Sequence, residues 1–97
     1  MKRNDDKQRS YPYVNNNGSS RESLIRDRLT ARSAVLVAIK KLSECHPHGR
    51  DYQTAPKGAW EAGQARYAAH FAALDKLYNE LGDEAEFLYN DGLEQKR

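Results

Sequence analysis

One cysteine and two histidines, Cys45, His46 and His48, form the densest cluster of metal-ligating and nucleophilic side chains in the sequence. A closed zinc site needs four ligands at regular spacing, whereas this cluster offers three, and Pro47 restricts their geometry. A cysteine–histidine nucleophile needs a third group that orients the histidine, and none is evident beside it. We therefore expect a helix-ending loop here, with no bound metal, no cofactor and no catalytic residue.

Carboxylates are the second group of side chains with possible chemistry, as general acids or bases. They fall outside the apolar positions of their region, so a solvated helix face is the simpler interpretation. The sequence also has no glycine-rich phosphate loop and no serine–histidine–aspartate pattern. Together these observations predict a protein that is not an enzyme. The carboxylates concerned are Asp75, Glu80, Asp83, Glu84 and Glu86.

The segment Arg50-Asp51-Tyr52 has the residue types of a binding contact, because arginine and tyrosine are favoured anchors of protein interfaces. The same three residues can also serve the structure. Asp51 can accept backbone amides in a turn, Arg50 can donate to exposed helix carbonyls, and Tyr52 can close the end of a hairpin. Both interpretations stay open, and this segment is the first candidate for partner binding.

Two further groups are candidate partner contacts. Four arginines crowd the start of the first expected helix, where they can form a basic strip for phosphate or an acidic protein, or simply a solvated helix face. Two tyrosines flank a proline in the polar N-terminal segment, a pattern that can dock as an extended peptide. The predicted partner-binding residues are therefore Arg50, Asp51 and Tyr52 together with Arg28, Arg32, Tyr11 and Tyr13.

Size and charge limit the fold that must position these residues. A chain of 97 residues forms one domain, and two helices alone rarely bury enough apolar area to offset the loss of chain entropy. We therefore expect a partner or a second copy. The net charge of +2 is too small to predict nucleic-acid binding. The front of the chain is basic and its back is acidic, which favours pairing between two antiparallel helices.

Apolar periodicity predicts an all-α fold, a two-helix antiparallel hairpin. Ser19 to Glu22 fits a capping box that starts the first helix, and the proline and glycine of residues 46–49 end it. The second helix is expected to open around Pro56 and to continue through Gly82. The predicted parts are a disordered polar tail at 1–18, a hairpin at 19–92 (helix 19–45, loop 46–55, helix 56–90) and a frayed tail at 93–97.

The second helix carries a heptad seam. Apolar and aromatic residues recur every seven positions, with a second set falling four residues after the first. Paired hairpins can bury such seams as a four-helix bundle, so we expect a homodimer. The predicted self-association residues are Trp60, Tyr67, Phe71, Leu74, Tyr78 and Leu81.

The segment from His46 to Tyr52 forms a Pro-x-Gly-Arg-Asp-Tyr turn, followed by Ala59-Trp60-Glu61-Ala62, Ala68-Ala69-His70 and the stretch from Leu74 to Leu81. This pattern resembles a family of small phage and prophage helical-hairpin proteins, and the resemblance covers residues 30–90. It implies a phage accessory protein that binds and inhibits a host regulator or an anti-phage-defence protein, in the manner of anti-CRISPR proteins.

Two alternative functions stay open. A sponge for a cyclic nucleotide defence signal would hold phosphates on arginines and stack bases on tyrosines at a subunit interface. A small DNA-binding regulator would use the basic first helix, although no short helix-turn-helix spacing is visible. Nucleic acid is therefore not the expected partner.

The sequence also predicts a compartment. A single cysteine suits a reducing environment, and no signal peptide follows the first residues. The longest apolar run is far shorter than the ~20 residues that span a bilayer. We expect a protein of the host cytoplasm without membrane contact.

Overall fold

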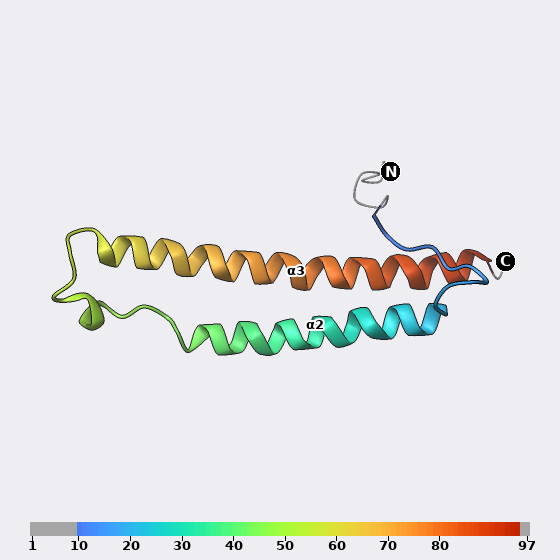
Figure 1. Cartoon of the computed structure of the whole chain (residues 1–97), viewed down its shortest axis with the longest axis horizontal. Helices are drawn as coiled ribbons and strands as arrows, with labels where there is room; N and C mark the ends of the chain where they lie inside the picture. Colours follow the sequence, from blue (N-terminus) through green and yellow to red (C-terminus); the bar gives the residue numbers. More distant parts are fainter. Residues whose placement is uncertain (1–9, 96–97) are drawn as a thin grey trace.

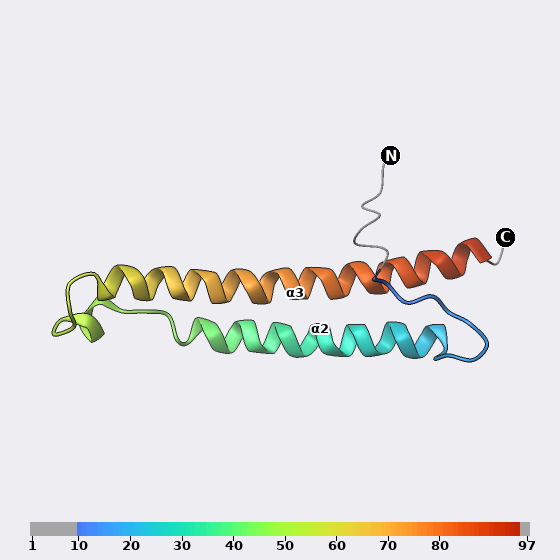
Figure 2. The ribbon, with the colours of Figure 1, turned by 45° about the horizontal axis from the view of Figure 1, so that its top comes forward.

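The computed structural model describes residues 10–95, and this part of the chain is built from two long antiparallel helices (Figure 1, Figure 2). α2 is Arg21–Ser43, α3 is Ala59–Gln95, and a short 3-10 helix, η1, lies between them at Gly49–Tyr52. The molecule is a rod of 64 × 27 × 21 Å. The predicted all-α hairpin is confirmed. In the described residues, neither long helix is apolar enough to cross a bilayer.

α2 is shorter at both ends than the predicted helix 19–45. Ser20 is the N-cap in place of Ser19, and its hydroxyl accepts a hydrogen bond from the Ser23 amide at 3.1 Å. At the other end the Cys45 amide donates to the Leu42 carbonyl at 2.8 Å. This bond tightens the last turn into 3-10 geometry and ends the α-helix at Ser43.

α3 begins later than the predicted helix 56–90. Gly58 has a φ of 87°, a left-handed conformation that interrupts the helical backbone between Pro56 and Ala59. The Ala62 amide then donates to the Gly58 carbonyl at 3.0 Å, which makes the first bond of the helix. The loop therefore extends through Gly58 and does not end at residue 55.

α3 also ends later than predicted. It continues through Gly82, as expected, but it passes Gly92 as well and reaches Gln95. Gly92 does not end the helix because Arg21 of α2 lies against it and donates to the Leu88 carbonyl at 2.7 Å. Part of the predicted frayed tail is therefore helical, and residues 96–97 lie outside the described residues.

The heptad seam of α3 faces α2 of the same chain. The Tyr78 ring lies under the Arg32 guanidinium, with 4.0 Å between the guanidinium carbon and the ring centroid. Leu74 and Leu81, about one turn before and one turn after Tyr78, are half-buried, while Phe71 is exposed at the edge of the seam. We predicted that this seam packs against a second copy, but its first partner is α2, which supplies a facing row of its own.

The buried core is thin and lies at the base, the end of the rod where α2 begins and α3 ends. Among the described residues, the buried hydrophobic side chains are Tyr11, Ala85 and Leu88. Leu88 is 0% exposed. Arg21 of α2 donates to its carbonyl, and Tyr11 of the N-terminal segment packs on the neighbouring Phe87. Towards the other end two helices alone cover each other, so large apolar side chains stay in contact with water.

Residues 10–18 pack against α3, contrary to the predicted disordered tail at 1–18. Tyr11 is 8% exposed, and its ring meets Phe87 edge-on with 5.2 Å between centroids. Tyr13 packs on the same ring at 5.8 Å. Burial of aromatic surface outweighs the polar composition of this segment. Residues 1–9 of the predicted tail lie outside the described residues.

Opposite charges on the two helices pair, which confirms the expected complementarity. Arg21 lies 3.3 Å from Asp91, and Arg28 lies 3.1 Å from Glu84. Glu84, Asp91 and Leu77 recur every seven residues and therefore form one row along α3. We call this side of the hairpin, with its two arginines, the ion-paired face.

Candidate functional site

The hairpin tip, residues 44–58, carries the first candidate segment on η1. Two backbone bonds fix the turn: the Asp51 amide donates to the His48 carbonyl at 3.0 Å, and the Ala55 amide donates to the Tyr52 carbonyl at 3.1 Å. Arg50 and Asp51 are both exposed. The tip therefore presents a cation and an anion from a hydrogen-bonded turn at the end of the rod.

Tyr52 anchors this turn to α3. Its ring is tilted 58° to the Trp60 ring, with 5.4 Å between centroids. The phenol end enters a notch at Gly63, where an added Cβ would stand 2.9 Å from the tyrosine Cζ. Only glycine leaves room for the ring at this position. The three residues thus divide their roles, with Tyr52 as the anchor and Arg50 and Asp51 as the exposed groups.

The cysteine and the two histidines of the tip extend its aromatic packing. His46 meets Tyr67 edge-on with 5.2 Å between centroids, and His48 lies 5.8 Å from His46. Cys45 is exposed, with its sulfur 3.9 Å from the Lys41 carbonyl oxygen. Across residues 10–95, no three histidine, cysteine or acidic side chains are placed to hold a metal ion.

Arg28 and Arg32, two predicted partner contacts, turn towards α3. Arg28 Nε donates to Glu84 Oε1 at 3.1 Å, and Arg32 Nε donates to the Tyr78 carbonyl at 3.2 Å. Gly82 makes room for the second contact, since a Cβ there would lie 3.0 Å from Arg32 Nε. Both guanidinium groups are engaged within the chain, so we leave them out of the candidate site. This engagement also weakens the DNA-binding alternative.

The two predicted tyrosine contacts differ in their surroundings. Tyr11 is buried against Phe87 and has no surface to offer while the N-terminal segment is packed. Tyr13 is 65% exposed and keeps one side in solvent. Both lie at the base, far from the tip, so the structure does not bring them together with Arg50 and Asp51.

Sequence reasoning missed three glycines of α3 that each admit a side chain from the first half of the chain. A glycine inside a helix costs roughly 0.5–1 kcal/mol relative to alanine. The presence of three glycines in an alanine-rich helix could therefore have indicated that other side chains approach α3 closely. The pairs are Gly63 with Tyr52, Gly82 with Arg32 and Gly92 with Arg21.

Replacing Gly63 by alanine is expected to expel Tyr52 from its notch while α3 stays helical. The added Cβ takes the space of the phenol, whereas alanine favours the helix by about 1 kcal/mol. Trp60 is the single tryptophan, so a changed emission spectrum with unchanged far-ultraviolet circular dichroism is the expected result. Gly49→Ala is the control, because its Cβ meets nothing within 4 Å. A Gly63→Ala spectrum identical to wild type contradicts the anchoring role.

The candidate site is thus the hairpin tip, with Arg50 and Asp51 as its exposed groups and Tyr52 as its anchor. Its chemistry is recognition of a complementary polar surface, since an exposed guanidinium and carboxylate can both form charge-assisted hydrogen bonds with a partner. No protein-family model, curated protein or solved structure matches this chain.

Proposed function

We propose that this chain is a phage accessory protein without enzymatic activity that inhibits a host or anti-phage-defence protein by direct binding, and that it acts as a homodimer. The observation that carries the proposal is the exposed Arg50–Asp51 pair on a turn anchored through Tyr52. A preorganised turn loses little conformational entropy on binding, which favours affinity. The resemblance of residues 46–52 to small phage hairpin proteins supports the same class of function.

The rod shape also supports a binding role. α3 has 37 residues and is therefore about 55 Å long at about 1.5 Å per residue. Two helices and one short turn make a narrow end that can enter a concave site on a partner. The buried core lies at the base, so the tip can contact a partner without disturbing the residues that hold the hairpin together.

The test is affinity capture of a partner from bacterial lysate by the tagged protein, read by mass spectrometry. Wild type is expected to enrich one host or defence protein at near-stoichiometric yield. Arg50→Ala and Asp51→Ala are each expected to lower its recovery at least tenfold, the scale of an interface hot spot. Tyr52 is not a suitable first variant, because its loss also frees the turn.

Lys57→Ala is the matched control, since Lys57 is another exposed cation of the same loop. It is expected to recover the partner as wild type does. Wild-type recovery by both Arg50→Ala and Asp51→Ala would assign the tip a purely structural role and contradict the proposed site. Failure of the wild type to enrich any protein, with lysates of phage-sensitive and phage-resistant hosts, would contradict the proposed function itself.

A further inference from the structure

The side of the hairpin opposite the ion-paired face is apolar. Phe71 lies three residues before Leu74 and Leu77 lies three after it, so they project about 60° to either side of that inward-facing residue. Leu77 belongs to the row of Glu84 and Asp91 and therefore lies on the ion-paired face. Phe71 lies on the side of α3 away from that face. Tyr89 follows Phe71 by five full turns and shares its direction. Both Phe71 and Tyr89 are exposed.

α2 continues the same apolar side. Arg28 reaches the ion-paired face, whereas Arg32, about 40° further round the helix, reaches Gly82 in the row of Tyr89. Leu36 and Leu29 lie a further 40–60° or so round in the same sense, and both are exposed. The apolar face is therefore made by Ile25, Leu29 and Leu36 of α2 with Phe71 and Tyr89 of α3.

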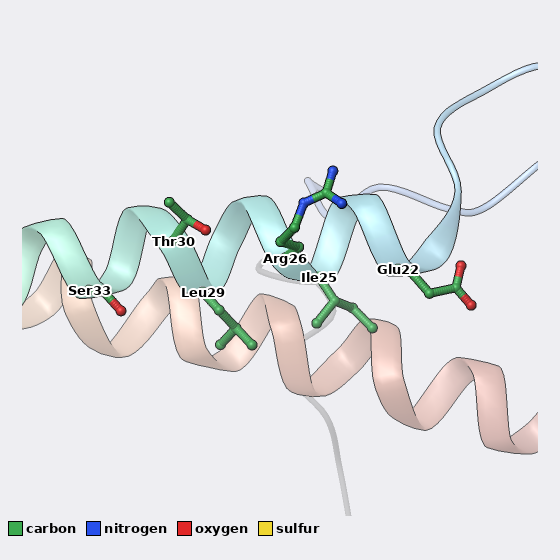
Figure 3. Close-up of a pocket in the computed structure, with 6 residues that line it drawn as sticks. All are labelled: Glu22, Ile25, Arg26, Leu29, Thr30 and Ser33. Atoms are coloured by element: carbon green, nitrogen blue, oxygen red, sulfur yellow. The ribbon is translucent and has the colours of Figure 1, made fainter.

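A shallow depression opens on the α2 part of this face. It is lined by Ile25 and Leu29 between polar neighbours, and Figure 3 shows Ile25, Leu29 and Ser33 on one side of α2 with Arg26 and Thr30 on the other. Glu22 closes the end nearest the base. An apolar floor with a polar rim is the usual composition of a protein interface.

We propose that a second copy of this chain docks antiparallel on the apolar face, about a two-fold axis near the middle of α2. Counting along both helices from the Arg28–Glu84 contact places Tyr89 level with Ser23 and Phe71 level with Lys41. The face is therefore nearly symmetric along the rod. Antiparallel docking brings each Tyr89 near the level of the partner's Phe71.

In this antiparallel dimer the two ends of α2 complement each other in apolar contacts and in charge. A two-fold axis midway between Ile25 and Leu36 sets each of these residues opposite the other in the second copy. The same axis sets Glu22 within one residue of the level of Lys40. The two side chains share a direction because they lie five full turns apart, and both are exposed. Parallel docking would instead set like charges together at both positions, so the charges favour the antiparallel mode.

The charge of the whole rod favours the same mode. Residues 33–78, the half with the tip, carry six basic and four acidic side chains. The base half of the sequence, 1–32 and 79–97, carries ten basic and ten acidic side chains and is neutral. Antiparallel copies place each basic tip half beside a neutral base half, whereas parallel copies would place the two basic tip halves side by side.

The available area also suits a second copy. α2 has 23 residues, which makes it about 34 Å long, and two packed helices are roughly 20 Å wide. The face thus offers on the order of 700 Å², close to the ~800 Å² that each partner buries in a standard interface. Because antiparallel copies carry their tips at opposite ends, the dimer is bivalent for the partner of the proposed function, and this last consequence rests on that function.

Light scattering after size-exclusion chromatography, over a series of concentrations, tests the interface. Wild type is expected at twice the 11.1 kDa of one chain. Leu29→Glu is expected to run as a monomer with wild-type circular dichroism, because it buries a carboxylate in the interface. Leu77→Glu is the matched control and stays dimeric, since Leu77 is 43% exposed against 44% for Leu29 but lies on the other face. A monomeric wild type, or a dimeric Leu29→Glu, overturns the proposal.

Charge exchange tests the orientation without changing an apolar residue. Glu22→Lys alone is expected to weaken the dimer roughly fivefold to tenfold, because it replaces two exposed ion pairs by repulsion. Glu22→Lys with Lys40→Glu is expected to restore wild-type affinity. A parallel dimer predicts no restoration, so that result overturns the antiparallel mode.

The two proposals fail separately. Arg50→Ala alters the tip and leaves the apolar face intact, so it is expected to lose the captured partner and keep the dimer. Leu29→Glu is expected to keep the partner and lose the dimer. Loss of the dimer in Arg50→Ala would show that the tip, and not the apolar face, holds the copies together.

Discussion

Leu88→Ala is expected to lower the free energy of unfolding by about 2–5 kcal/mol, the range for deleting a fully buried leucine side chain. Leu88 is 0% exposed and is the fully buried side chain of a core of which Tyr11 and Ala85 are the other buried hydrophobic members among the described residues. A small core has few neighbours that can collapse into the resulting cavity. For a chain of this size such a loss is a large fraction of the total stability.

The measurement is chemical unfolding followed by circular dichroism, at one fixed protein concentration so that self-association contributes equally. Leu77→Ala is the matched control on the same helix. Leu77 is on the exposed part of α3, so its truncation is expected to change stability by no more than about 0.5 kcal/mol. Equal losses for the two variants would mean that the core does not lie at the base.

Periodicity was sufficient to predict the hairpin because a heptad seam this long marks one apolar side of α3, which another helix has to cover. The recurrence from Trp60 to Leu88 fixes which side of α3 is apolar, and the proline and glycine near residue 47 force the chain to reverse. Helix ends were less predictable. Whether Gly92 ends a helix depends on a contact with Arg21, which lies far away in the sequence.

The N-terminal segment shows why composition misleads at short range. Residues 10–18 are polar as a group, and a polar average predicts disorder. Two aromatic side chains decide the outcome, because Tyr11 and Tyr13 find Phe87 on α3. Nothing in residues 10–18 themselves predicts that the Phe87 ring lies close enough to pack against.

The candidate site was only partly predictable for a related reason. Arg50, Asp51 and Tyr52 were identified as a group, but their division into exposed groups and an anchor follows from the notch at Gly63. Arg28 and Arg32 are of the residue type expected in a basic strip that binds a partner. Their direction depends on the register of α2 against α3, which a single sequence does not specify.

Arg21→Gln is expected to lower the free energy of unfolding by about 1.5–3 kcal/mol, the scale of a hydrogen bond to a charged group. Arg21 Nη1 donates to the Leu88 carbonyl at 2.7 Å and lies 3.3 Å from Asp91, and its side chain is 18% exposed. Glutamine is too short to make both contacts, so a carbonyl and a carboxylate lose a charged donor in a partly buried site. The turn of α3 around Gly92 loses its support as well.

Arg26→Gln is the matched control on the same helix and supplies the decisive comparison. Arg26 is largely exposed, and its ion pair with Asp27 is 3.8 Å long and solvated, so its loss is expected to cost about 0.5 kcal/mol or less. Added salt is expected to reduce this control effect and to change the Arg21 effect little, because screening acts mainly on exposed charges. If Arg21→Gln costs no more than Arg26→Gln, the contact of Arg21 with α3 at Gly92 contributes nothing measurable to the free energy of unfolding. If the cost is larger, this contact holds the start of α2 to the end of α3.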